Sequence, residues 1–131
     1  MKCLDATFLI DFLRNDRSAI NKALEIKDDA LVTTSINIFE VLLGIHRKRK
    51  SSEHEMEQFK KLISKLDVLY FDTDASFISS KITADLISEG KEIDAMDCLT
   101  AGIMISKNCN AIVTRNKEHF QRIKWIKVEG Y

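Results

Sequence analysis

Three acidic residues, Asp5, Glu40 and Asp97, lie where apolar stretches of the sequence end or where helical patterns begin. If the fold gathers these points at one rim, each pair of carboxylates within about 5 Å repels by roughly 3 kcal/mol at an effective dielectric constant of 20. The chain has 20 basic and 20 acidic residues, so no surplus of positive charge offsets that repulsion. A hard divalent cation such as Mg²⁺ or Mn²⁺ does, because it binds carboxylate oxygens and keeps several waters.

The first of these acids, Asp5, interrupts the apolar opening stretch MKCLDATFLIDFL. Residues 2–6 resemble a short buried strand, and a carboxylate at its end is expensive to bury unless it is paired or coordinated. Two interpretations are open: Asp5 caps the helix that follows, or it binds a ligand. Thr7 is also placed to cap that helix, and Asp11 falls within the helix as an edge or solvated residue.

Glu40 lies on a helix predicted from Ile36, just outside its broad apolar arc. That arc consists of Ile36, Ile38, Phe39, Val41, Leu42, Leu43 and Ile45. Beside Asn37 and Gly44, Glu40 has the position of an ordinary polar-face residue, which the periodicity favours. The functional alternative is that Gly44, one turn on, leaves space above the carboxylate for an ion or a substrate.

Asp94 and Asp97 stand three residues apart at the predicted start of another helix. Acids at the N-cap and the third helical position satisfy exposed amides and complement the helix dipole, which is the structural interpretation of the pair. One turn further on, the residues are Cys98 and Ala101, so neither acid has a cation partner within the helix. Acids beside small residues leave room for a positively charged ligand.

Strands alternate with helices along the whole chain. The hydrophobic pattern predicts strands at 2–6, 30–35, 67–72, 110–116 and 123–131, and helices at 7–15, 36–50, 52–66, 75–90 and 94–109. Thr33, Thr34 and Ser35 are suited to capping the second of these helices, and Gly90 is placed as a C-cap. This alternation predicts a mostly parallel sheet covered on both faces, with functional groups at the carboxyl ends of its strands.

The composition fits one cytoplasmic domain spanning residues 1–131. There are 131 residues without proline, and the hydrophobic fraction of 45% suits a folded chain. The three cysteines form no CxxC pair, which favours a reducing compartment, and no apolar run is long enough to span a bilayer. We therefore expect a soluble, unprocessed protein without membrane contact, and not a uniformly basic nucleic-acid binder.

Four sequence motifs resemble PIN-domain ribonucleases, and most of all the VapC-type toxins of prokaryotic toxin–antitoxin pairs. They are LDATFLIDFLR, TTSINIFEVLLGI, GKEIDAMDCLTAGIM and AIVTRNKEHF, in this order over nearly the whole chain. The resemblance implies a three-layer α/β/α fold in which Asp5, Glu40 and Asp97 are catalytic and bind Mg²⁺ or Mn²⁺. It also implies hydrolysis of RNA phosphodiester bonds, a cognate VapB-type antitoxin and a homodimer.

We expect supporting roles for Thr7 and Asn116 from the same resemblance, and for Asp94 from its position beside Asp97. Thr7 matches a small polar residue that is more often Asn or Ser in these toxins. Asn116 stands where the family usually has a fourth acid, which puts a second metal ion in doubt, and Glu118 is a nearby substitute. For RNA binding, Arg115 and Arg14 are the candidate phosphate contacts.

The basic run from His46 to Lys50 fits a solvated helix end better than an RNA-binding patch.

Other activities are less well supported by the residues. A phosphatase of the haloacid dehalogenase type needs a second Asp at the position of Thr7, and Cys98 fits a core residue better than a nucleophile. A degenerate, non-catalytic PIN-like RNA-binding module is an alternative because of Asn116. A housekeeping RNA-processing nuclease is another, and an adjacent antitoxin gene would argue against it.

Overall fold

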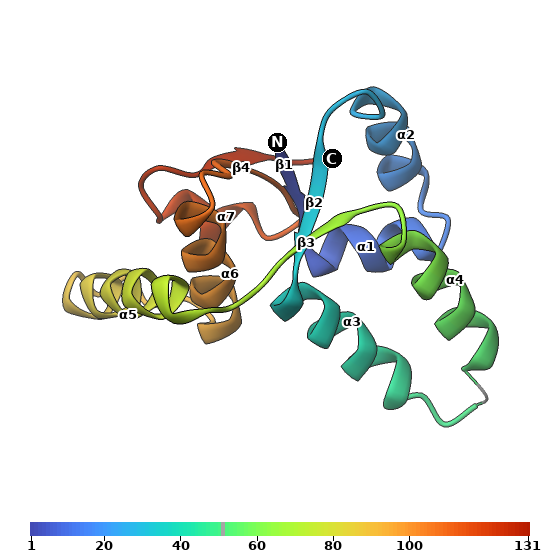
Figure 1. Cartoon of the computed structure of the whole chain (residues 1–131), viewed down its shortest axis with the longest axis horizontal. Helices are drawn as coiled ribbons and strands as arrows, with labels where there is room; N and C mark the ends of the chain where they lie inside the picture. Colours follow the sequence, from blue (N-terminus) through green and yellow to red (C-terminus); the bar gives the residue numbers. More distant parts are fainter. Residues whose placement is uncertain (51) are drawn as a thin grey trace.

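The computed structural model describes residues 1–50 and 52–131, in which strands and helices alternate as predicted (Figure 1). In chain order the elements are β1 (Lys2–Leu4), α1 (Ala6–Leu13), α2 (Arg17–Glu25), β2 (Leu31–Thr34), α3 (Ser35–His46), α4 (Glu53–Ile63), β3 (Asp67–Leu69), α5 (Thr73–Ser88), α6 (Ala95–Ser106), β4 (Ala111–Val113), α7 (Lys117–Gln121) and β5 (Lys127–Glu129). None of the described helices has the length and apolar character that crossing a membrane requires.

The strands form one sheet in the order β3-β2-β1-β4-β5, and each of these pairings is parallel. From the central strand β1 the chain first builds outward to β2 and β3, and then crosses to the other side for β4 and β5. The direction of building therefore reverses between β1 and β4, and such a switch point opens a crevice at the carboxyl ends of the strands.

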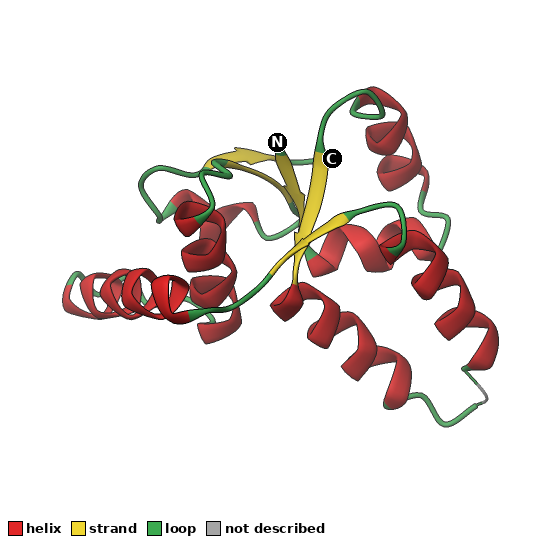
Figure 2. Cartoon of the chain, in the orientation of Figure 1, coloured by secondary structure: helices red, strands yellow, loops and turns green. Residues whose placement is uncertain are grey.

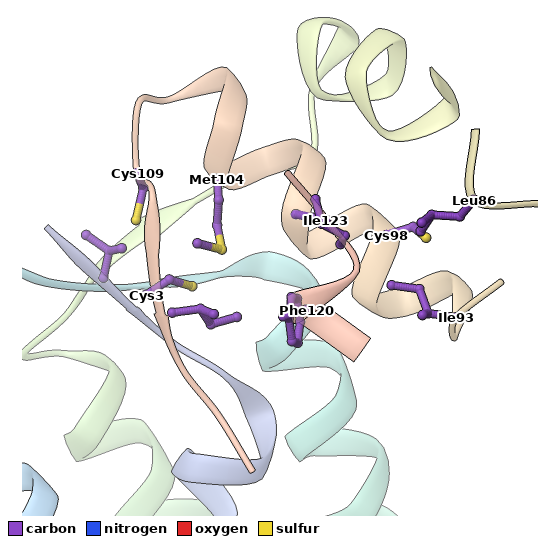
Figure 3. Packing of buried hydrophobic residues seen from close by; sticks show 11 residues of the cluster. Cys3, Leu86, Ile93, Cys98, Met104, Cys109, Phe120 and Ile123 are labelled. Carbon is purple, nitrogen blue, oxygen red and sulfur yellow. The ribbon is translucent and has the colours of Figure 1, made fainter. Parts of the chain in front are cut away.

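Helices cover both faces of the sheet, so the expected three-layer α/β fold is confirmed (Figures 1 and 2). Successive strand residues point to opposite faces. Accordingly, Cys3 and Ile112 belong to the core beneath α5, α6 and α7, which Figure 3 shows, whereas Leu4 and Val113 belong to the core formed with α1 to α4.

Helices α2 and α7 were not predicted from the sequence. Helix α2 begins at an Asp16 side chain that accepts from the Ala19 amide, and α7 is only five residues long. Helix α3 ends at His46, four residues earlier than predicted, and residues 46–50 are exposed. Gly90 has the predicted C-cap role: its φ is +68°, and the following amide of Lys91 donates to the carbonyl of Leu86.

Candidate active site

Asp5 directly follows β1 and is only 2% exposed. Its Oδ2 accepts hydrogen bonds from the hydroxyl of Thr7 at 2.9 Å and from the hydroxyl of Thr114 at 2.7 Å. Burial raises the pKa of Asp5 above its ordinary value, and the two hydroxyl hydrogen bonds oppose that rise. Asp5 is therefore a buried carboxylate held in a fixed orientation at the switch point of the sheet.

The capping interpretations of Asp5 and Thr7 are both wrong. Asp5 occupies the N-cap position of α1, but the amide of Ala6 donates to Oδ1 of Asn37, and the carboxylate bonds to hydroxyls instead. Thr7 lies inside the first turn of α1. Thr7 thus supplies one of the two hydroxyls that bind the Asp5 carboxylate.

The segment Thr114–Asn116 completes the surroundings of Asp5 from the end of β4. The amide of Arg115 donates to Oγ1 of Thr7 at 3.0 Å, and the amide of Asn116 donates to Oγ1 of Thr114 at 2.9 Å. Each hydroxyl accepts from this segment and donates to Asp5, so their rotation is fixed. Asn116 is half-buried here, and its role toward a metal remains a prediction.

Glu40 is half-buried on α3 and does not occupy the outward polar face that periodicity favoured. Helix α3 is turned so that Asn37 is fully buried, while Phe39 and Leu43 are 50% and 44% exposed. Asn37 explains this rotation, because its amide group donates to the Leu4 carbonyl and accepts from the Ala6 amide. These hydrogen bonds to the end of β1 therefore fix the rotation of α3, which leaves Glu40 half-buried.

The two acids of α6 have different environments. Asp94 is exposed and caps the helix, because its Oδ1 accepts from the amide of Met96 at 2.8 Å. Asp97 is 5% exposed, and its Oδ2 lies 2.6 Å from Nδ1 of His119 on α7. The capping interpretation is therefore confirmed for Asp94, whereas Asp97 has a partner outside its own helix.

The acidic side chains from β1, α3 and α6 act on one another electrostatically. Burial, and then the negative charges of Asp5, Asp97 and Asp94, raise the pKa of Glu40 to about 7. Burial also raises the pKa of Asp97 to about 6; the hydrogen bond from His119 opposes this shift and the charge of Asp5 adds to it. The carboxylates that the sequence singled out therefore lie near enough to influence one another's ionisation.

These oxygen donors suit a hard cation, although the described residues contain no ready-made cage of three His, Cys, Asp or Glu side chains. Mg²⁺ needs no such cage, because it commonly binds through one or two carboxylates and keeps the rest of its water shell. Mutual repulsion among Asp5, Glu40 and Asp97 is the property that a divalent ion relieves. The donor set therefore fits a divalent metal.

Asp11 is not the edge or solvated residue that the sequence suggested. It is 4% exposed, pairs with the guanidinium of Arg115 and accepts from the hydroxyl of Tyr131 at 2.6 Å. Periodicity failed here because both partners come from the far end of the chain.

Two other residues considered for the site, Arg14 and Glu118, line hollows of the described surface. Arg14 is the C-cap of α1, about 12 Å from the helix start at 1.5 Å per residue, and it lines a groove between α1, α3 and α4. Glu118 is exposed in a hollow that it shares with Lys91 and Arg122.

Sequence reasoning missed three residues that shape the site: Thr114, Asn37 and His119. Thr114 carried a usable signal, because a hydroxyl directly after a buried strand lies at the functional edge of a parallel sheet. Asn37, on an otherwise apolar helix face, was visible as an exception but was read as solvent-facing. His119 had no signal in the sequence, since its contact with Asp97 joins residues 22 apart.

Comparison with known proteins assigns this fold to a class. A model of the PIN domain matches residues 2–126, and the chain therefore belongs to the PIN-domain family. Ribonuclease VapC1 of Methanocaldococcus jannaschii is 31% identical over 129 residues, covering 98% of this chain and 85% of that protein. The tRNA(fMet)-specific endonuclease VapC of Salmonella typhimurium is 27% identical over 128 residues, covering 98% and 96%.

Solved structures agree with this assignment. VapBC2 from Rickettsia felis, bound to a DNA fragment from its promoter, matches with a TM-score of 0.87 at 21% identity, covering 99% of this chain and 98% of that chain. DNA-bound VapBC from Salmonella typhimurium matches with a TM-score of 0.86 at 26% identity, covering 98% and 96%. The expected resemblance to VapC-type PIN ribonucleases is confirmed.

Proposed function

We propose that the protein is a divalent-metal-dependent endoribonuclease and the toxin of a VapBC-type toxin–antitoxin pair. The observation that carries this proposal is that Asp5 and Asp97 lie near enough to Glu40 for their negative charges to add to the burial that raises its pKa to about 7. The ribonuclease relatives support the activity, and the structural relatives support the toxin role.

Asp5, Glu40 and Asp97 are the residues that would hold Mg²⁺ or Mn²⁺. When bound, such an ion lowers the pKa of a coordinated water and stabilises negative charge on the phosphate. The protein contributes orientation: Thr7 and Thr114 fix Asp5, and His119 fixes Asp97. The half-buried Glu40 carboxylate has a pKa of about 7 in the metal-free protein, so a bound cation would displace its proton.

RNA cleavage by the purified protein tests the activity. We expect cleavage of RNA, with tRNA(fMet) as the first substrate to try because of the Salmonella relative, in Mg²⁺ or Mn²⁺ but not in EDTA. Asp5→Asn and Glu40→Gln should each abolish it. Asp85→Asn is the matched control, because this exposed acid on α5 pairs only with Lys81 in the described structure. RNA binding without metal-dependent cleavage would favour the non-catalytic module that Asn116 suggests.

The toxin role has its own test. Expression of the chain alone should slow growth of its host, and co-expression of the cognate VapB-type antitoxin should restore it. Harmless expression of a folded and active protein would favour the housekeeping nuclease.

A groove of about 420 Å³ between α1, α3 and α4 is a candidate surface for the antitoxin. Its floor includes Ile10, Leu13 and Val41, and its rim carries Arg14 and Lys48. Loss of antitoxin binding on Leu13→Glu, with RNA cleavage retained, would support this surface.

A homodimer is also part of the proposal. Large apolar side chains are exposed along α3 and from the end of β3 into α5, namely Phe39, Leu43, Tyr70, Phe71 and Phe77. Such a concentration marks a surface that another protein covers. Light scattering should give twice the 15.0 kDa chain mass, and Phe77→Ser should lower it.

A further inference from the structure

An ion pair with one buried partner, Asp11, adjoins the candidate site without including any of its acids. Asp11 on α1 pairs with the Arg115 guanidinium and accepts from the Tyr131 hydroxyl. The Tyr131 ring packs edge-on against Phe8, with ring centres 5.1 Å apart, which holds that hydroxyl in place. We call Asp11, Arg115 and Tyr131 the Asp11 clamp. Because Asp11 itself is buried, loss of Arg115 would leave its charge without a cation partner, so the clamp resists rearrangement.

The clamp is connected to Asp5 through the backbone. The Arg115 amide donates to Oγ1 of Thr7, and Thr7 donates to Asp5. The residue before Arg115 is Thr114, the second hydroxyl donor to Asp5. Whatever fixes the side chain of Arg115 therefore also fixes both hydroxyls that orient the Asp5 carboxylate.

We propose that Asp11 is a positioning residue for Asp5, acting through Arg115. In this proposal the main role of Arg115 is to hold the metal site in place from within the Asp11 clamp, and contact with RNA is secondary. The inference rests on the proposed metal-dependent function. The Arg115 side chain is 61% exposed, so direct phosphate contact is the competing role that the test must separate. Partners of metal-binding groups commonly change metal affinity about 10-fold or more when removed.

Mn²⁺ titration by calorimetry in the absence of RNA tests this inference. Asp11→Asn and Arg115→Ala should each weaken Mn²⁺ binding about tenfold. The direction of the change in Mn²⁺ affinity for Arg115→Ala is decisive, because loss of a nearby positive charge would by itself tighten cation binding. Tyr131→Phe changes no charge and should weaken binding by a smaller factor. The double variant should bind no more weakly than either single variant, because both act through one contact.

Controls separate this inference from the function on which it rests. Lys107→Ala removes an exposed ion pair with Asp72 and should leave Mn²⁺ affinity unchanged. Thermal unfolding confirms that each variant is folded. If wild type binds Mn²⁺ in an Asp97-dependent manner while Arg115→Ala binds it equally well or more tightly, the positioning role is wrong. If wild type binds no Mn²⁺, the proposed function and this inference both fail.

Discussion

Nδ1 of His119 lies 2.6 Å from Oδ2 of Asp97, so the short helix α7 holds the buried acid of α6. An ionised carboxylate only accepts hydrogen bonds, so the histidine nitrogen donates. Burial nevertheless outweighs this hydrogen bond and raises the pKa of Asp97 to about 6. The site therefore keeps an acid that is harder to ionise than a free aspartate, and a bound cation would favour its ionised form.

Asp97→Asn should abolish nuclease activity and stabilise the metal-free protein. Because the pKa of Asp97 is raised in the folded state, its ionisation destabilises the fold as pH rises from about 4 to about 6. The variant should gain roughly 3 kcal/mol of unfolding free energy at pH 8 and little at pH 3.5. Urea unfolding at both pH values measures this gain, with Asp85→Asn as control. Full Mg²⁺-dependent activity in Asp97→Asn would refute the site.

Metal binding should release protons at mildly acidic pH. Glu40 and Asp97, with pKa values of about 7 and 6, are largely or partly protonated at pH 6 in the metal-free protein. Mn²⁺ must displace these protons, so its affinity should rise from pH 6 to pH 8. Calorimetry in two buffers of different ionisation enthalpy should show release of about one proton at pH 6 and much less at pH 8. A pH-independent affinity would contradict the raised pKa values.

Thr114→Val should destabilise the protein and weaken Mn²⁺ binding, whereas Thr114→Ser should do neither. Valine removes the donor to Asp5 and the acceptor for the Asn116 amide, at about 2 kcal/mol of unfolding free energy. The hydroxyl stabilises ionised Asp5, so the loss should be larger at pH 8 than at acid pH, where Asp5 is protonated. Equal losses for both variants would point to a packing effect instead.

Asn116→Asp should tighten divalent-metal binding about tenfold, since it adds a negative charge beside the other acids. The backbone amide of Asn116 donates to Oγ1 of Thr114, which also binds Asp5. Asn116 therefore occupies the N-cap position of α7 close to the acids. Calorimetric titration of Mn²⁺ into both proteins measures the change. Unchanged affinity would mean that the side chain points away from the metal.

Local features of the chain were predictable from sequence because their partners are close in sequence. The Thr34 side chain caps α3 through the Asn37 amide, Asp94 caps α6, and Gly90 ends α5, all within a few residues of the groups that they satisfy. The alternation of strand and helix periods likewise predicted the α/β fold, because each apolar face must be buried against a neighbouring layer.

The site itself required tertiary structure. The sequence identified Asp5, Glu40 and Asp97 as candidates, but it placed Glu40 on an outward face and left Asp11 solvated. Only the folded chain brings Asn37 to the end of β1, 33 residues away from Leu4, and Arg115 to Asp11 across 104 residues. Helical periodicity measures apolarity alone, whereas the rotation of α3 and the burial of Asp11 are decided by hydrogen bonds to groups distant in sequence.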